Sequence, residues 1–407
     1  MLHLRCLIVC SALLLLHGKI NSQVLWQFNK DTIISWHYAG GDEFNAARPD
    51  TTQWDYWYGW SRSIFSQKEQ QYYTDGKNHV LNNGSINIFA LKKDTLAPMV
   101  DWLPDNDSLI LDDRFYGFNK RLFHYTSGML QSRQSYQYGY FEIKFRMPSE
   151  KGYWPAFWLY GGTPNEEIDW MELKTEKPHA IHVGRHSKNR DENKMQHGLR
   201  KKWWGDWVQF KGNLTKGYHV IAGEWNKDYV KYFLNGECIA FSKVSLPEAK
   251  FLCVNLAVPG KEGSFHPAPD ATSQRSGNFE IDYIRVWSSD RQQAIPFPET
   301  LPGDLKKTDD TLSATSLRSK SKFLYGKRAD HKTEGFILSL IPLGNGQYNL
   351  QALGKVIPSS ARFFYSDGYF VGSAPLKYGM NLFSTGKKKI VLTVECYGRK
   401  LSYTIIP

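Results

Sequence analysis

Cysteine is scarce in this chain of 407 residues, which contains only five. Beyond residue 22 only Cys238, Cys253 and Cys396 remain. Three thiols permit at most one internal disulfide, and their spacing matches no metal-binding motif, so a disulfide-stapled fold and a cysteine metal site are excluded. Cys238 and Cys253 fall on expected strands and are interpreted as buried core residues rather than as a bridge.

Long apolar runs are also rare. One run, residues 6–16, follows Arg5 and is too short to span a bilayer. This pattern is typical of a secretory signal, so residues 1–22 are predicted to be a signal peptide of a secreted, periplasmic or cell-surface protein. A lipoprotein signal ending at Cys10 fits less well, because Val9 is bulky where a small residue is expected. No other stretch is long enough to cross a membrane.

Helical periodicity is scarce as well, and short strand-like segments with turn signals recur instead over residues 24–290. Residues 85–90 and 230–234 are examples, and the second precedes Asn235-Gly236, a hairpin signal. Recurring short strands of this kind predict a sandwich of two antiparallel sheets.

Composition divides the chain after this region. Residues 291–322 hold few apolar residues and many Pro, Thr, Ser, Asp and Lys, as linkers do. Over 323–407 the β pattern returns, which predicts a small all-β domain, either a carbohydrate-binding or partner module or a spacer. The predicted order is therefore signal peptide 1–22, main domain 23–290, linker 291–322 and small β domain 323–407.

Within the main domain, residues 167–172 alternate carboxylates with large apolar residues. Glu167 and Asp169 are two apart, which places both on one face of a strand. Strict alternation would turn Glu172 to the other face, and one extra residue, a β-bulge, returns it to the acidic face. Because three carboxylates on one face repel each other, a substrate lying across them is favoured over a solvated acidic face without function.

Two glutamates on one strand face suit cleavage of a glycosidic bond. With the bulge, Glu167 and Glu172 are four pleated steps apart, roughly 13 Å between Cα atoms. Side chains that lean together bring the carboxyls to about 5–5.5 Å, the separation of retaining enzymes. Asp169 between them is expected to hold a proton or hydrogen bond that separates their pKa values.

The acidic stretch and its surroundings resemble glycoside hydrolase family 16, in the branch whose motif carries the bulge. The resemblance covers about residues 24–290, and its landmarks, in family order, are residues 42–45, 70–74, 125–128, 138–146, 152–159, 167–172, 255–258 and 282–286. This branch includes laminarinases, agarases, porphyranases and κ-carrageenases. The resemblance implies a β-jelly-roll, concanavalin A-like sandwich with an open cleft.

The resemblance implies a retaining endo-β-glycosidase that hydrolyses a polysaccharide, either β-1,3-glucan-like or galactan. Glu167 matches the nucleophile, Asp169 the assisting acid and Glu172 the acid/base. A non-catalytic glycan-binding protein is the alternative, but such relatives generally lose the carboxylates that this chain keeps. Transglycosylation would use the same residues. One departure is Glu166, where the family often has glycine.

Five aromatic or imidazole side chains are candidate sugar contacts. Trp154 and Trp158 match the cleft tryptophans of the family, and indole stacks on the apolar face of a pyranose. Core packing is the alternative for each. Trp60 and Tyr73 are further candidates. His182 is expected on the neighbouring strand, where it hydrogen-bonds a sugar hydroxyl or has a structural role.

The balance of charge concerns the substrate. Lys and Arg number 51 against 40 Asp and Glu, a formal net charge of +11, and seven basic residues lie within 184–202, beginning with Arg185. If this stretch borders the cleft, it attracts a sulfated galactan, because Arg pairs well with sulfate oxygens. The alternatives are a solvated basic loop or attraction to an anionic cell surface.

No cofactor is expected for the reaction, although many family members bind a structural calcium on the convex side. Glu43, the carbonyl of Gly84 and Asp282 are the matching candidates, since oxygen ligands suit this ion. The expected partner is the polysaccharide alone, with no nucleic acid and no transmembrane segment, and the protein is expected to be a monomer.

Overall fold

The computed structural model divides the chain into two compact units, one formed by Met1–Tyr38 with Gly335–Pro407 and one by Ala39–Glu334. The structure describes residues 23–28, 33–64, 68–82, 84–101, 104–105, 108–112, 115–161, 166–187, 203–261, 265, 267–270, 276–289, 336–354, 360–365, 370–375, 378–384, 389–396 and 399–405. The predicted signal peptide and linker lie outside these residues.

Every named element among the described residues is a β-strand, which confirms the all-β prediction. Within the described part of the chain, no helix has the length and apolar character needed to cross a bilayer.

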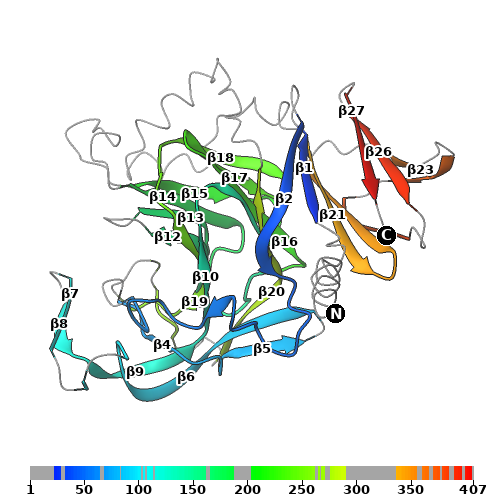
Figure 1. The fold of residues 1–407 in the computed structure, drawn as a ribbon. Helices are drawn as coiled ribbons and strands as arrows, with labels where there is room; N and C mark the ends of the chain where they lie inside the picture. Colours follow the sequence, from blue (N-terminus) through cyan, green and yellow to red (C-terminus); the bar gives the residue numbers. More distant parts are fainter. Residues whose placement is uncertain are drawn as a thin grey trace, which may run out of the picture. The chain divides into compact units, whose positions relative to one another are not determined.

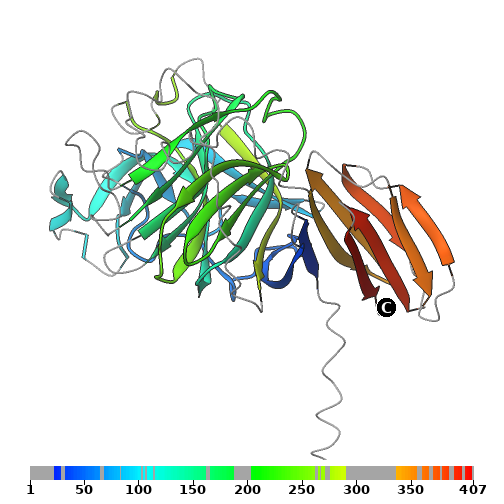
Figure 2. The ribbon, with the colours of Figure 1, turned by 90° about the horizontal axis from the view of Figure 1, so that it is seen from above.

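The larger unit is a sandwich of two sheets (Figures 1 and 2). One is a seven-stranded antiparallel sheet in the order β15 (Trp203–Gln209), β14 (Ala180–His186), β13 (Glu166–Glu172), β12 (Trp154–Gly161), β19 (Lys250–Ala257), β10 (Met129–Tyr136) and β3 (Trp54–Asp55). The catalytic candidates lie near its middle, on β13.

The opposite sheet runs β18 (Glu237–Lys243), β17 (Tyr229–Leu234), β16 (His219–Trp225), β11 (Gly139–Arg146), β20 (Ser276–Ser288) and β6 (Ser85–Pro98). β5 (His79–Asn82) and β9 (Lys120–Ser127) pair with β6, and β4 (Gln71–Tyr73) runs parallel to β9. A separate hairpin joins β7 (Ser108–Asp112) to β8 (Phe115–Phe118). The arrangement is the jelly roll that the sequence predicts.

Alternation along the strands builds the main core between these sheets. Phe157 and Leu159 of β12 and Ile181 and Val183 of β14 point into it, together with Phe141 and other residues from the opposite sheet. The intervening residues of β12 and β14 therefore lie on the other side of the seven-stranded sheet, which is called the site face below.

The smaller unit combines both ends of the chain. Its first sheet contains β2 (Ile33–Asp42), which continues into the larger unit, β1 (Val24–Phe28), β21 (Phe336–Gly344), β22 (Gln347–Gly354) and β25 (Gly379–Ser384). The second runs β24 (Phe370–Pro375), β23 (Ser360–Tyr365), β26 (Ile390–Cys396) and β27 (Arg399–Ile405). Trp26 of β1 packs in its core against Tyr403, so the predicted start of the main domain at residue 23 is corrected.

Two local predictions are confirmed. Asn235 and Gly236 join β17 to β18 with φ of 52° and 82°, the left-handed values that a type I′ hairpin turn requires at both central positions. Cys238 and Cys253 are buried and unbridged, as expected of core residues.

Candidate active site

A β-bulge on β13 places the three carboxylates on the site face. Asp169 pairs with Gly184 of β14, whereas Glu172 pairs with His182, so three residues of β13 span two of its neighbour. The register toward β12 shifts at the same place. The extra residue returns Glu172 to the face that holds Glu167 and Asp169, which confirms the predicted bulge.

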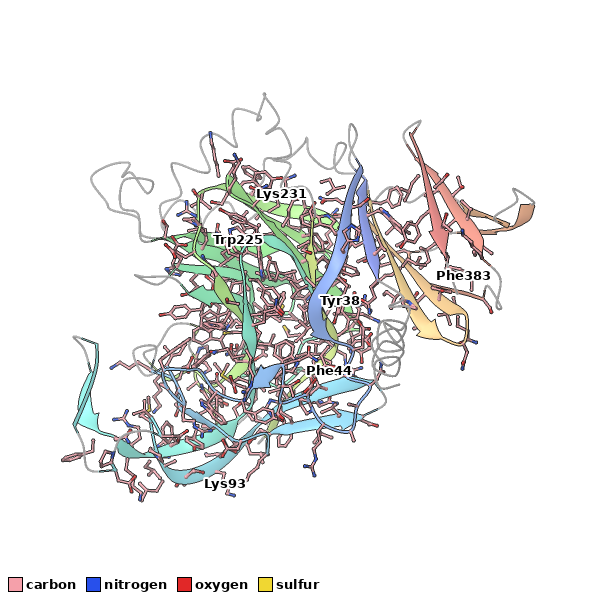
Figure 3. The ribbon with its side chains drawn as sticks, in the orientation of Figure 1. Tyr38, Phe44, Lys93, Trp225, Lys231 and Phe383 are labelled. Atoms are coloured by element: carbon pink, nitrogen blue, oxygen red, sulfur yellow. The ribbon has the colours of Figure 1, made fainter. Side chains whose placement is uncertain are left out.

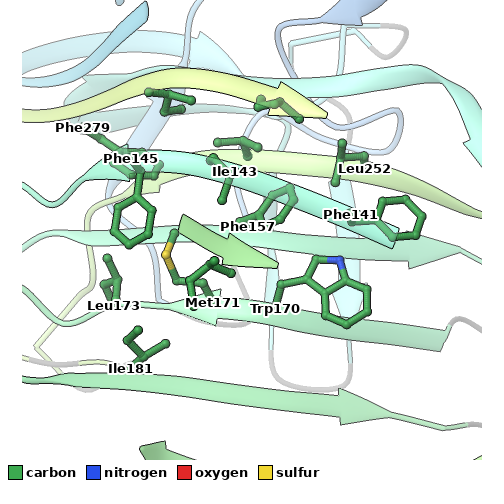
Figure 4. Close-up of a cluster of buried hydrophobic side chains, with 14 of the residues drawn as sticks. Phe141, Ile143, Phe145, Phe157, Trp170, Met171, Leu173, Ile181, Leu252 and Phe279 are labelled. Atoms are coloured by element: carbon green, nitrogen blue, oxygen red, sulfur yellow. The ribbon is translucent and has the colours of Figure 1, made fainter. Parts of the chain in front are cut away.

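The bulge also explains why two consecutive residues point into the core. Trp170 and Met171 are both fully buried there, beside Phe141 and Phe157 (Figure 4). Room for the indole comes from Gly223 on the opposite sheet, where an added Cβ would lie 2.1 Å from the Trp170 ring. The core thus holds the bulge in place from behind.

Two histidines of β14 contact the carboxylates. His182 Nδ1 lies 2.8 Å from Glu172 Oε2, and His186 Nε2 lies 3.8 Å from Asp169 Oδ2. Glu167, Asp169 and His186 each offer a polar atom, all within 4.8 Å of one another. Gly184, between the two histidines, leaves the space beside Asp169 free of a side chain from β14.

Burial and mutual repulsion control the protonation of this group. Burial raises the pKa of Glu167 well above its ordinary value, and the neighbouring Asp169, with which it shares a hydrogen bond, raises it further. Burial also raises the pKa of Asp169, to about 6, with a further contribution from the charge of Glu172. Glu167 and Asp169 therefore share a proton, because both cannot easily ionise side by side.

The pKa values of the two histidines are shifted in opposite directions. Burial lowers the pKa of His182, but its hydrogen bond to Glu172 and the charge of that residue outweigh this effect, so the net pKa is raised. Burial lowers the pKa of His186 and prevails over the attraction of Asp169. Through Nδ1, His182 contacts the carboxyl of Glu172, which is the structural role weighed as the alternative to a sugar contact.

Trp158 lies on the site face next to the carboxylates. It pairs with Asp169 across β12 and β13, and its indole nitrogen donates to Asn255 Oδ1 at 2.8 Å. The amide of Asn255 in turn donates to the hydroxyl of Tyr73 at 3.1 Å. Tyr73 is fully buried, so its predicted sugar contact is corrected to a supporting role.

Trp60 is half-buried and stacks on Tyr58, with ring centroids 4.7 Å apart. Its ring also lies 4.6 Å from that of Tyr160, which follows Trp158 on the same face of β12. Trp60 therefore flanks the Glu167 end of the site face, because Tyr160 pairs with Glu167.

A second aromatic group lies at the Glu172 end. Trp154 stacks on Phe265, with ring centroids 4.4 Å apart and planes only 5° from parallel. Phe265 also contacts His182 and Trp207. The ammonium group of Lys177 lies 4.3 Å from the centre of the Trp207 ring.

The predicted sugar contact at Arg185 is wrong. Arg185 lies between His182 and His186 in an alternation that places His182, Gly184 and His186 on the site face, so its side chain points the other way. It is 3% exposed, and its Nε donates to the hydroxyl of Ser242 on β18 at 3.1 Å. The other six basic residues of the 184–202 stretch lie outside the described residues.

Both acids among the residues proposed for calcium have cationic partners in the protein. Both oxygens of Glu43 pair with the guanidinium of Arg285, at 2.6 and 2.8 Å, and Asp282 pairs with Lys144. Each carboxylate is therefore already neutralised by a cation.

Glu166, the departure from the family pattern, has a structural partner. Its side chain faces away from Glu167 and accepts a hydrogen bond from Lys250 Nζ at 2.8 Å. Both side chains are almost fully buried, and the ammonium lies 4.6 Å from the Trp225 ring, labelled in Figure 3. This buried pair joins the beginning of β13 to β19.

Sequence reasoning missed His186, Phe265, Tyr160 and Trp207 as members of the site. Period-two counting from His182 and Trp158 would have found His186 and Tyr160. Trp207 pairs with His182 across β14 and β15, and Phe265 lies after β19, so their positions depend on strand order and on a loop.

A jelly-roll sandwich with three carboxylates on one face of a bulged central strand is the arrangement expected of a protein that acts on glycosidic bonds. The profile of glycosyl hydrolases family 16 matches residues 67–285, more than half of the chain. The chain belongs to this family.

Individual relatives agree with this assignment. The chain is 26% identical to an endo-1,3-1,4-beta-glycanase of Rhizobium meliloti, over 62% of this chain and 52% of that protein. It is 27% identical to a beta-glucanase of Rhodothermus marinus, over 67% and 92%. A laminarinase catalytic domain from Thermotoga petrophila shares the fold, with a TM-score of 0.50 and 23% identity, covering 63% of this chain and all of that one. The chain spans about half the length of the first of these relatives.

Proposed function

We propose that this protein is a retaining endo-β-glycosidase that hydrolyses a polysaccharide. The observation that carries the proposal is the bulge on β13, which aligns Glu167, Asp169 and Glu172 on one face. The family supports the retaining mechanism, in which the configuration at the anomeric carbon is inverted twice.

In the first step, the carboxylate of Glu167 attacks the anomeric carbon while the carboxyl of Glu172 gives its proton to the leaving oxygen. In the resting site the proton that the two side chains share lies on Glu167, whose pKa is raised more than that of Asp169. The attack requires Glu167 to be ionised, so this proton passes to Asp169 first. In the second step, Glu172 takes a proton from water, whose oxygen displaces Glu167 from the sugar. His182 orients Glu172 throughout, through the 2.8 Å contact.

For the substrate we propose a neutral β-glucan containing β-1,3 linkages. The named relatives are glucanases and glycanases. Arg185, the first residue of the basic stretch, points into the interior, which removes one of the groups expected to attract sulfate. A sulfated galactan is the second candidate, on the strength of the basic residues between 188 and 202 in the sequence.

A substrate panel tests both candidates. Laminarin, mixed-linkage β-glucan, agarose, porphyran and κ-carrageenan are incubated with the enzyme, and the products are sized and followed by NMR. We expect the glucans to be cleaved internally, with the β-anomer appearing first. Initial release of the α-anomer would contradict the retaining mechanism, and cleavage of galactans alone would reject the glucan assignment.

Secretion is also proposed, and sequencing the N-terminus of exported protein tests it.

A further inference from the structure

The ring of Phe265 covers one face of the Trp154 indole. Its ring lies parallel to the indole of Trp154 at 4.4 Å, which is the stacking geometry that a pyranose adopts on tryptophan. Trp154 is only 8% exposed as a result of its surroundings. The tryptophan that matches a sugar platform in the family is therefore covered by a side chain of the same protein.

This contact stands beside the catalytic group. Trp154 lies two residues before Ala156 on β12, and Ala156 pairs with Glu172 of β13. Phe265 also lies edge-on to His182, with ring centroids 5.6 Å apart, and His182 is the partner of Glu172. The covered platform is thus the next position along the site face beyond the acid/base.

The backbone at Phe265 is held in an unfavourable conformation. Its φ of 59° lies in the left-handed region, which is unfavourable for a bulky residue. Packing of the ring against Trp154, His182 and Trp207 offsets this strain. If residue 265 only connected two strands, glycine or asparagine would serve better, because both adopt this φ with less strain. The aromatic ring therefore indicates a role of its own.

The geometry points to Phe265 as a residue that determines substrate length, by closing the Trp154 platform at the Glu172 end of the site face. This inference rests on the proposed glycosidase function. Because Glu172 protonates the leaving oxygen, the closed platform belongs to the side of the leaving group. The wild-type enzyme then gains little binding affinity from sugar units beyond those nearest the cleaved bond on the leaving-group side.

The test is a double-mutant cycle on Phe265→Gly and Trp154→Ala, with β-1,3-linked gluco-oligosaccharides of increasing length as substrates. Glycine adopts the observed φ without strain and removes the ring. In Phe265→Gly, KM for the longer oligosaccharides falls roughly three- to tenfold, as expected for one new stacking contact, and the cleaved bond shifts along the chain. Adding Trp154→Ala removes this gain.

Phe265→Tyr is the matched control, because it keeps the ring and should keep the wild-type cleavage pattern. If Phe265→Gly does not fold, Phe265→Asn replaces it, since asparagine tolerates a positive φ. A folded variant with wild-type KM values and an unchanged cleavage pattern would overturn the inference while leaving the proposed function intact. Failure of the wild-type enzyme to cleave or bind any of these glucans would overturn both.

Discussion

Replacing Asp169 with asparagine should make the protein more stable and the enzyme slower. Asp169 is buried beside two other carboxyls, and its pKa is raised from 3.8 to about 6. At pH 7 the folded protein holds this group ionised against its environment, which costs roughly 3 kcal/mol of stability. Asparagine has the same shape and no charge, so Asp169→Asn removes this cost.

The gain is smaller than the full cost, because asparagine replaces only part of the hydrogen bonding to Glu167. Losing about 1 kcal/mol there leaves a net stabilisation of about 2 kcal/mol at pH 7. For a domain of this size, that corresponds to an increase of about 4–8 °C in the midpoint of thermal unfolding. The turnover number should fall at least about a hundredfold, since the proton shared with the nucleophile is disturbed.

The pH dependence identifies the cause. A carboxyl whose pKa is raised in the folded state binds more protons there, so its contribution to stability falls as the pH rises from about 4 to about 6 and is constant above that range. The advantage of Asp169→Asn should therefore be absent near pH 4 and complete by pH 7. Thermal unfolding of both proteins, followed by fluorescence across this range, measures it. An advantage that is equal at all pH values would refute the reasoning.

Three further outcomes are expected. Glu167→Gln should abolish turnover without loss of folding, checked by hydrolysis rate and circular dichroism, and activity above a few per cent would reject the nucleophile assignment. Gly223→Ala should destabilise the protein by about 3 kcal/mol by pressing on Trp170, whereas Gly59→Ala, which meets only an ordinary contact, should change little in denaturant titrations. Cleavage of laminarin should respond little to added NaCl, and a steep loss with salt would favour an anionic substrate.

Local patterns predicted the bulged strand β13 correctly because every step depends on neighbouring residues. Alternation placed Glu167 and Asp169 together, and electrostatic repulsion gave a reason for the bulge that returns Glu172. The same holds for the Asn235-Gly236 turn, whose φ values are a property of the dipeptide. Such features require no knowledge of distant parts of the chain.

Features that depend on distant segments were not predictable in this way. Tyr73 was expected in the cleft, but it is fully buried, and its hydroxyl accepts a hydrogen bond from the amide of Asn255, far along the chain. Strand β1 pairs with β21, more than three hundred residues later, and so joins the C-terminal unit instead of the one that follows it. Nothing in the composition of residues 24–28 distinguishes these two partners.

Arg185 shows how a correct principle fails when it is applied to a stretch instead of to each residue. Its place in a run of basic residues suggested a common role for all of them, yet on a strand the side chains alternate between faces. His182 faces the carboxylates, so His186 must face them too, and Arg185 must point into the sandwich, where Ser242 accepts its hydrogen bond. A buried guanidinium needs such partners, because burying an unpaired charge is unfavourable. A basic residue on a strand can therefore be assigned a sugar contact only after the face to which its side chain points has been determined.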